Sequence, residues 1–309
     1  MNLRGKRIMV VGGTGKIGKH FTPLLVKLGA KVSTVSFFVS RAERKLYEDL
    51  GVTTYHRDLG KPGSLRGVPG KFDWVFHMVG LKFGSEQDPD LTLRVNVYST
   101  AQAMEHFARS GAVAYASSGN VYPDTVKGAD ESMLPIPASF YALTRWGAEI
   151  MTDWYSRRNK TPAVVQRIFY AYNREFGVPA DIARQIRDGE AISLTTSRVN
   201  VIWLDDLMDQ MIRSMEYASV PARIINLTSP QVYDVREIAE KLGKLMGRNP
   251  KFKGQPKGDN LLADASLAKK LFGMPKTSLD AGLRMLAESV MRREFPLDKP
   301  AKWEYRKGF

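Results

Sequence analysis

Cysteine is absent from this sequence of 309 residues, and histidine is scarce. Without cysteine, the chain has no disulfide bond, no thiolate nucleophile and no cysteine-rich zinc site. The four histidines are scattered and lack the spacing of metal ligands. The sequence therefore predicts no metal site.

Long apolar runs are missing as well. None reaches the length that crosses a membrane, and no signal peptide precedes the first predicted strand. We therefore expect a cytoplasmic protein with no membrane partner. With 43% hydrophobic residues, the chain is long enough for a sizeable core in one large domain or two unequal ones.

Acidic residues are fewer than basic ones, 32 against 46, and the formal net charge is +14. This balance favours anionic ligands such as nucleotides and permits contact with nucleic acid. The basic residues are spread along the chain, with some concentration after residue 290, and residues 292–309 are predicted to lie on the surface. A solvated basic surface is favoured over a nucleic-acid partner as the interpretation.

A cluster of glycines lies between an apolar segment at 8–11 and the start of an amphipathic segment at 17–28. Glycines 12, 15 and 18 allow a sharp turn and a close approach of phosphate, and the helix that follows presents free N–H groups. The pattern of strand, glycine turn and helix predicts a dinucleotide site. Its contacts are predicted to be Gly12, Thr14, Gly15, Lys16, Ile17 and Gly18.

Strand-like and helix-like segments alternate over the first 170 residues. The predicted strands are 8–11, 31–39, 52–56, 72–78, 112–116 and 163–169, and the predicted helices are 17–28, 91–109 and 140–158. The alternation predicts an α/β fold with a Rossmann-type doubly wound parallel sheet.

The later part of the chain is richer in helix. Helices are predicted at 179–188, 205–217, 232–246 and 278–291, and strands at 199–204 and 223–227. We expect a dinucleotide-binding domain over residues 1–172. Residues 173–309 are expected to form mainly a smaller substrate-binding cap, with some segments returning to the Rossmann sheet.

No acidic residue stands near the end of the second predicted strand. An NAD site usually has Asp or Glu there to hold the ribose hydroxyls, but this place falls near Ser36, and Arg41 lies just beyond. The additional phosphate of NADP needs a cation. The pattern favours NADP slightly over NAD, although Arg41 could equally begin a solvated helix.

Other strand ends also carry candidate contacts, because ligands bind at the carboxyl ends of parallel strands. Asp58, followed by Leu59, could accept a hydrogen bond from the adenine amino group or cap the turn. Val79, Gly80 and Lys82 follow the fourth predicted strand. We expect these strand ends to face the cofactor.

Together these motifs resemble the extended short-chain dehydrogenase/reductase family, the NAD(P)-dependent epimerases and dehydratases, over essentially the whole chain. The three glycines match the family motif G-x-x-G-x-x-G, and Asp58-Leu59 matches its adenine-binding pair. Residues 75–82 are similar to a segment of UDP-galactose 4-epimerases in which the lysine, here Lys82, contacts the cofactor. Asn96 lies in a segment that resembles the family's structural asparagine segment and is included among the predicted cofactor-site residues.

The resemblance also implies a catalytic set. The family motif Y-x-x-x-K appears here as Tyr141 and Arg145, and the register of Val121-Tyr122 assigns the catalytic serine to Ser118. In the family, the tyrosine is the general acid/base, while the cation favours its ionised form and holds the nicotinamide ribose. An arginine keeps the charge but cannot relay a proton. A remnant that binds cofactor without turnover is the alternative interpretation of this pair.

The substrate side departs further from the family. Many nucleotide-sugar enzymes have an asparagine after the sixth strand, where this chain has Tyr170. Arg198 lies one residue from the register of the family's diphosphate-binding arginine. Both are predicted substrate contacts, although Tyr170 could simply pack in the cleft.

The favoured hypothesis is an NAD(P)-dependent epimerase/dehydratase or oxidoreductase acting on a sugar, with a nucleotide-linked sugar implied by the resemblance. Ser118, Tyr141 and Arg145 would form its catalytic set. The alternatives are an NADPH-dependent reductase of a non-nucleotide carbonyl and a noncatalytic cofactor-sensing or nucleic-acid-binding protein. The family also implies a homodimer through helices 91–109 and 140–158.

Overall fold

A seven-stranded parallel sheet forms the centre of the molecule. The computed structural model describes residues 2–258 and 260–295, so most of the basic C-terminal segment lies outside the described residues. The strand order is β11-β6-β5-β4-β1-β2-β3, and each neighbouring pair is parallel. The predicted Rossmann-type sheet is confirmed. Its strands are β1 (Arg7–Val11), β2 (Lys31–Ser36), β3 (Thr53–His56), β4 (Trp74–His77), β5 (Ala112–Ser118), β6 (Ala163–Ile168) and β11 (Arg223–Leu227).

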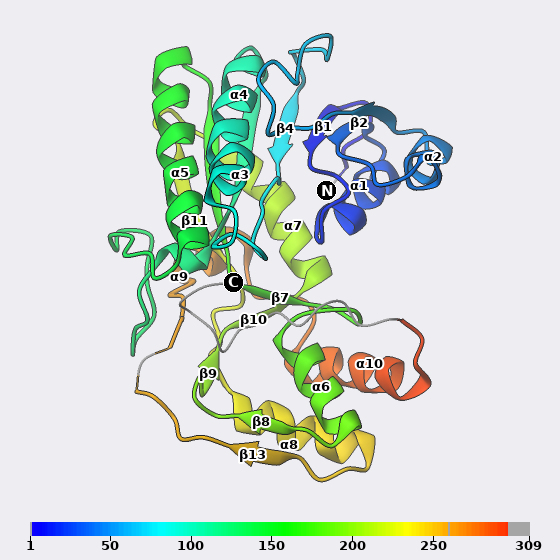
Figure 1. Ribbon diagram of the computed structural model, residues 1–309, viewed down its shortest axis with the longest axis vertical. Coiled ribbons are helices and arrows are strands. Elements are labelled where there is room, and N and C mark those ends of the chain that lie inside the picture. Colours follow the sequence, from blue (N-terminus) through cyan, green and yellow to red (C-terminus); the bar gives the residue numbers. More distant parts are fainter. Residues whose placement is uncertain (1, 259, 296–309) are drawn as a thin grey trace.

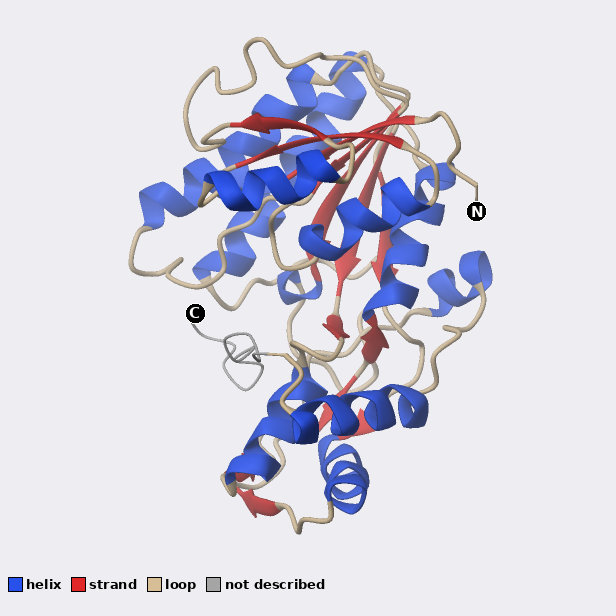
Figure 2. Ribbon diagram, turned by 90° about the vertical axis from the view of Figure 1, so that its right-hand side faces the viewer, coloured by secondary structure: helices blue, strands red, loops and turns tan. Residues whose placement is uncertain are grey.

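Helices cover both faces of this sheet (Figure 2). Alternate residues of a strand point to opposite faces, so Ile8 and Val10 pack in one hydrophobic cluster while Met9 and Val11 pack in another. The large lobe thus has two core layers, one on each side of the sheet. Its first helices are α1 (Gly18–Lys27), α2 (Arg41–Asp49), α3 (Pro89–Leu93), α4 (Ser99–His106) and α5 (Phe140–Asn159).

A smaller lobe lies beyond one end of the sheet (Figure 1). Its core is a separate cluster that includes Ile182, Leu242 and Leu283. Short parallel pairs accompany it, because β8 pairs with β13 and β7 pairs with β10. Its elements are β7 (Tyr170–Tyr172), α6 (Val178–Asp188), β8 (Ala191–Ser193), β10 (Val201–Trp203), α8 (Val235–Met246), β13 (Lys251–Lys253) and α10 (Leu279–Arg292).

Some later segments belong to the large lobe. Strand β11 extends the sheet beside β6. Helices α7 (Leu204–Ser214) and α9 (Ser266–Phe272) contribute to the same core cluster as β1. The two-residue strands β9 (Arg198–Val199) and β12 (Tyr233–Asp234) form an antiparallel pair.

The long helix predicted at 91–109 is present over residues 89–106, but it is not a regular α-helix throughout. A π-helical turn, η1 (Arg94–Tyr98), separates α3 from α4. Such turns insert one extra residue into a helix. Here the turn carries Asn96, whose buried amide bonds both main-chain groups of Leu81 and the hydroxyl of Thr144. The π-helical turn thus lies where the Asn96 side chain holds a neighbouring loop.

The single strand predicted at 199–204 is also divided. Asn200 separates β9 from β10, and its amide donates to the carbonyls of Ser229 and Gln231. The sequence pattern did not resolve this break, because the partners of Asn200 are distant in sequence.

Across the described ranges, no helix is both long and apolar enough to cross a membrane.

Candidate active site

A cavity of about 680 Å³ opens at the carboxyl ends of the strands. Residues just after β1, β3 and β4, and the last residues of β2, β5 and β6, line it together with the first turns of α5. This volume lies within the range of small-molecule and cofactor sites. The sheet therefore gathers segments from much of the large lobe around one concave space.

The glycine turn forms one wall of the cavity. A Cβ atom at Gly18 would lie 2.5 Å from the carbonyl oxygen of Gly12, and one at Gly13 would lie 2.3 Å from the Thr34 hydroxyl. Side chains are therefore excluded, and the bare backbone stays open to the cavity in front of α1. Such a turn before a helix suits a pyrophosphate group, so these residues fit a dinucleotide.

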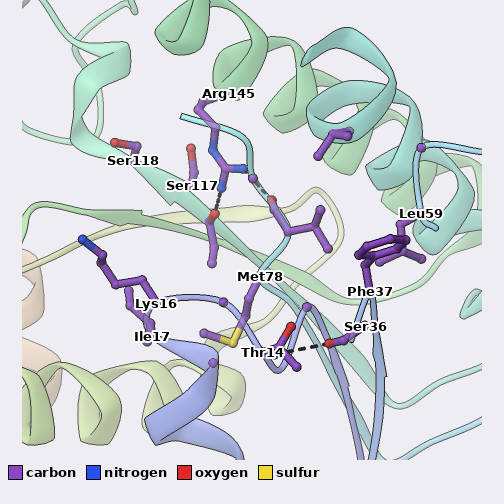
Figure 3. A pocket seen from close by; sticks show the side chains of 18 of the residues that line it. Thr14, Lys16, Ile17, Ser36, Phe37, Leu59, Met78, Ser117, Ser118 and Arg145 are labelled. Carbon is purple, nitrogen blue, oxygen red and sulfur yellow. Dashed lines mark hydrogen bonds between the residues drawn. The ribbon is translucent and has the colours of Figure 1, made fainter. Parts of the chain in front are cut away.

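The predicted contacts of the turn all line the cavity: Gly12, Thr14, Gly15, Lys16, Ile17 and Gly18. Ser36 also lines it, and its hydroxyl accepts a hydrogen bond from the Thr14 main-chain N–H at 3.3 Å. This bond ties the turn to the end of β2 (Figure 3).

Asp58 and Leu59 reach the cavity beyond β3. The Asp58 carboxylate accepts from the Gly60 main-chain N–H at 3.1 Å. It therefore caps the turn, as one of the two interpretations of the sequence expected, and Asp58 also lines the cavity. Arg41, by contrast, is exposed at the start of α2 and is not part of the lining.

Arg145 is held beneath the cavity by two strand ends. Its guanidinium donates to the carbonyl oxygen of Val79 at 2.7 Å and to that of Ala116 (Figure 3). The side chain is 4% exposed, and its charged group lies 4.7 Å from the Tyr115 ring centre. The arginine thus joins the loop after β4 to β5 and still lines the cavity.

Gly80 makes room for this arginine. A Cβ atom at Gly80 would lie 2.6 Å from Nη1 of Arg145, well inside normal contact distance. The backbone of Gly80 has no positive φ that demands glycine. The reason for glycine at this position is therefore the close guanidinium group.

Neutral groups surround Arg145 on its buried side. Burial, and next the charge of Arg145, lower the pKa of His77 to about 3. Burial also raises the pKa of Tyr115 well above its ordinary value. Both side chains are neutral at pH 7, so neither compensates the positive charge of Arg145.

Tyr141 and Ser118 line the same cavity. The Tyr141 ring centre lies 6.0 Å from the Arg145 guanidinium carbon, as expected for residues four apart on one helical face. The Ser118 hydroxyl oxygen accepts from the main-chain N–H and the side-chain amide of Asn120, at 3.2 and 3.1 Å. The lone pairs of this oxygen are thus engaged, and its proton can be donated to a ligand.

Several lining residues were missed by the sequence interpretation. They are Phe37, Arg57, Gly60, Met78, Leu91, Val95, Ala116, Ser117 and Ile168. The adjacent serines at the end of β5 were a usable signal for Ser117. The others follow from strand pairing and side-chain direction, for which a single sequence gave no sign.

Five predicted contacts do not line the cavity: Arg41, Lys82, Asn96, Tyr170 and Arg198. Lys82 lies over the Phe83 ring, 5.5 Å from its centre. Asn96 is fully buried and holds the loop after β4 against α5. Tyr170 lies in β7, and Arg198 in β9 donates to the Val126 carbonyl at 3.2 Å.

A buried ion pair supports the floor of the site. Arg167 of β6 and Glu149 of α5 are 3% and 5% exposed, and their closest charged atoms are 2.7 Å apart. Ser117, which lines the cavity, donates to the same carboxylate. Glu149 thus links the centre of α5 to β6 through Arg167 and to the active-site end of β5 through Ser117.

We expect Glu149→Ala to lower the free energy of unfolding by about 3–5 kcal/mol, because it leaves the Arg167 charge buried without its partner. Denaturant unfolding measures the change. The control is Asp49→Ala, which removes an exposed partner of Lys45 and should cost less than about 1 kcal/mol. Equal losses in the two variants would contradict a stabilising role for the buried pair.

The parallel sheet, the glycine turn and the cavity at the strand ends define a Rossmann-type dinucleotide-binding protein. A model of the NAD dependent epimerase/dehydratase family matches residues 8–228. The chain belongs to this family, which confirms the predicted enzyme class and the resemblance from which it came.

Curated relatives extend the comparison to nearly the whole chain. UDP-glucuronic acid decarboxylase 2 of Arabidopsis thaliana is 25% identical, over 94% of this chain and 70% of the relative. UDP-glucuronic acid decarboxylase 1 of Xenopus tropicalis is 23% identical, over 96% of this chain and 77% of the relative.

A solved structure shows the same fold. The UDP-glucuronic acid 4-epimerase of Bacillus cereus in complex with NAD superimposes with a TM-score of 0.80 at 20% identity, over 93% of this chain and 96% of that one. At this identity the likeness concerns the fold.

Proposed function

We propose that this protein is a nicotinamide-dependent enzyme that oxidises a UDP-linked sugar, with return of the hydride giving epimerisation. The observation that carries the proposal is one cavity that contains the glycine turn, Ser118, Tyr141 and Arg145. The named activities of the relatives, UDP-glucuronic acid decarboxylases and epimerases, support a UDP-sugar as substrate.

A bound nicotinamide cofactor would supply the acceptor for a hydride from a carbon of the sugar, and the donor for its return. Residues of the protein must then remove the proton of the hydroxyl group on that carbon. Tyr141 accepts this proton as general base, and Ser118 donates a hydrogen bond to the same oxygen. Loss of the hydride from carbon and of the proton from oxygen converts the alcohol to a carbonyl.

Arg145 supports this chemistry with its charge. It places a permanent cation beside Tyr141 and has N–H donors beyond the two that bind strand-end carbonyls. We assign one of the remaining donors to the nicotinamide ribose. Because arginine does not release a proton at neutral pH, the proton from Tyr141 must leave by another route.

The nucleotide part of the substrate is assigned to the region between the lobes. We propose that Tyr170 and Arg198 contact it there, because β7 and β9 follow the cavity-lining end of β6 in the chain. Tyr170 offers a ring and a hydroxyl where many relatives of this kind have an amide. A different contact to the sugar or diphosphate is the expected consequence.

Thermal shift and turnover assays test the function. With NAD⁺ or NADP⁺ present, UDP-glucuronic acid or UDP-galactose should raise the melting temperature, since ligands that bind the folded state stabilise it. Conversion is followed by chromatography of the sugar nucleotides. Reduction of simple carbonyls without any UDP-sugar effect would favour the alternative reductase, and cofactor binding without turnover of any substrate would favour a noncatalytic protein.

We also propose a homodimer through α5 and its neighbours. The apolar residues Leu143, Ile150 and Trp154 of α5 are 46%, 48% and 51% exposed. Their spacing places them along one side of the helix. Tyr98 of η1, the π-helical turn beside α5, is 40% exposed. A second copy would remove this apolar strip from water.

Trp154→Glu should convert the dimer to a monomer, because it places a charge in the buried strip. Light scattering coupled to size-exclusion chromatography gives the mass. Leu46→Glu is the matched control, since Leu46 is 66% exposed on α2, away from this strip. A monomeric wild-type protein would overturn the proposed dimer.

A further inference from the structure

The end of the cavity beside β2 lacks the acid that usually binds the adenosine ribose. Ser36 stands at this place, is 1% exposed, and accepts a hydrogen bond from the Thr14 N–H. Phe37 follows and lines the cavity although it is 62% exposed. Neither side chain repels a negatively charged group.

Arg57 lies directly beside this place. Strands β2 and β3 pair so that Ser36 stands opposite His56. The next residue, Arg57, then donates its main-chain N–H to the Ser36 carbonyl at 3.0 Å. Arg57 is also one of the residues that line the cavity. Strand pairing therefore puts a cation next to the position from which the acid is missing.

The guanidinium group of Arg57 is largely available. It donates from Nη1 to the His56 carbonyl at 2.9 Å, which uses one of the five N–H donors of an arginine. Within residues 2–258 and 260–295, Arg57 forms no salt bridge. Its positive charge is therefore not compensated by a carboxylate of the described chain.

Asp58, the acidic residue next to Arg57, does not compensate the positive charge of Arg57. The Asp58 carboxylate accepts from the Gly60 N–H and lies 3.6 Å from the Lys61 ammonium. Its negative charge is thus offset by Lys61. Arg57 and Asp58 line the cavity and Lys61 does not, and the three residues together carry one net positive charge.

We propose that Arg57 forms a subsite for a phosphate group on the adenosine ribose, so that the cavity prefers NADP to NAD. The inference rests on the proposed function, because it requires a dinucleotide with its adenosine at this end. A guanidinium group binds phosphate through two parallel hydrogen bonds. The free hydroxyl of NAD offers no such partner. Both cofactors carry the same nicotinamide, so the proposed reaction is unchanged.

Isothermal titration calorimetry with NADP⁺ and NAD⁺ tests the proposal on three proteins: wild type, Arg57→Gln and Arg41→Gln. Wild type should bind NADP⁺ at least about tenfold more tightly than NAD⁺. Arg57→Gln should lose about tenfold in NADP⁺ affinity and less than about threefold in NAD⁺ affinity, since only the phosphate contact is removed. Arg41→Gln is the matched control, because Arg41 is exposed outside the cavity.

Salt provides a second readout. Added salt should weaken NADP⁺ binding to wild type more than to Arg57→Gln, because it screens a charge pair that the variant lacks. The proposal is overturned if wild type binds NAD⁺ as tightly as NADP⁺, if Arg57→Gln weakens both equally, or if Arg41→Gln has the same effect. NAD⁺ binding without preference overturns the subsite alone, whereas binding of neither cofactor overturns the proposed function as well.

Discussion

Tyr141→Phe should lower turnover of a UDP-sugar by about 10²–10⁴-fold, the usual contribution of a positioned acid/base group. The substitution removes one hydroxyl from a half-buried ring at the cavity wall. It leaves the glycine turn and Arg145 in place, so cofactor affinity should stay within about twofold. Turnover and calorimetric titration of the same preparations separate the two effects.

Tyr55→Phe is the control for this experiment, because Tyr55 packs in the core of the large lobe and does not line the cavity. It should retain wild-type turnover. If Tyr141→Phe also keeps full turnover, the assignment of the proton transfer to Tyr141 is wrong. If wild type has no turnover with any sugar nucleotide, the noncatalytic alternative gains support.

Arg145→Met should have the second large effect, on both turnover and stability. The variant keeps an unbranched side chain but loses the charge and the two hydrogen bonds to the carbonyls of Val79 and Ala116. Hydrogen bonds from a charged donor contribute about 1.5–3 kcal/mol each, so the free energy of unfolding should fall by several kcal/mol. Loss of the cation beside Tyr141 should lower turnover by about 10²-fold or more.

Arg145→Lys separates charge from shape. A lysine restores the family's Y-x-x-x-K spacing and keeps the cation, so turnover should fall less than in Arg145→Met. It lacks the planar fork that reaches two carbonyls, so stability should still fall. Turnover in Arg145→Lys as low as in Arg145→Met would show that the fork, and not the charge, is what the reaction needs.

Gly80→Ala gives an independent test of the same contact. The added methyl group would overlap with Nη1 of Arg145, so it should destabilise the wild-type protein. The effect should shrink in the Arg145→Lys background, where the guanidinium is gone. A double-mutant cycle of unfolding free energies measures this coupling. Additive effects would contradict the direct contact.

Much of the fold could be predicted from the sequence. The spacing of apolar residues and the glycines at 12, 15 and 18 are local patterns, and they predicted the order of the main strands and helices and the dinucleotide turn. Several short motifs in the expected order, from the glycine turn to the segment around Tyr141, together indicated the family. Each of these signals lies within a short segment, because period and turn geometry are properties of neighbouring residues.

The composition of the cavity depended on long-range pairing. The pairing of β2 with β3 places Arg57 beside Ser36, while Arg41, which is nearer in sequence to Ser36, begins an exposed helix. Asn96 does not line the cavity, because its side chain forms hydrogen bonds with Leu81 and Thr144. No local pattern encodes such contacts.

Arg145 shows most clearly which features the sequence predicted and which features only the tertiary structure established. Its type and its spacing from Tyr141 are visible in the sequence, and they predicted a cation near the reacting groups. Its attachment to two strand ends, and the need for glycine at residue 80, arise only when β4, β5 and α5 pack together. Hydrogen bonds and steric contacts depend on distances in space, and folding alone sets those distances.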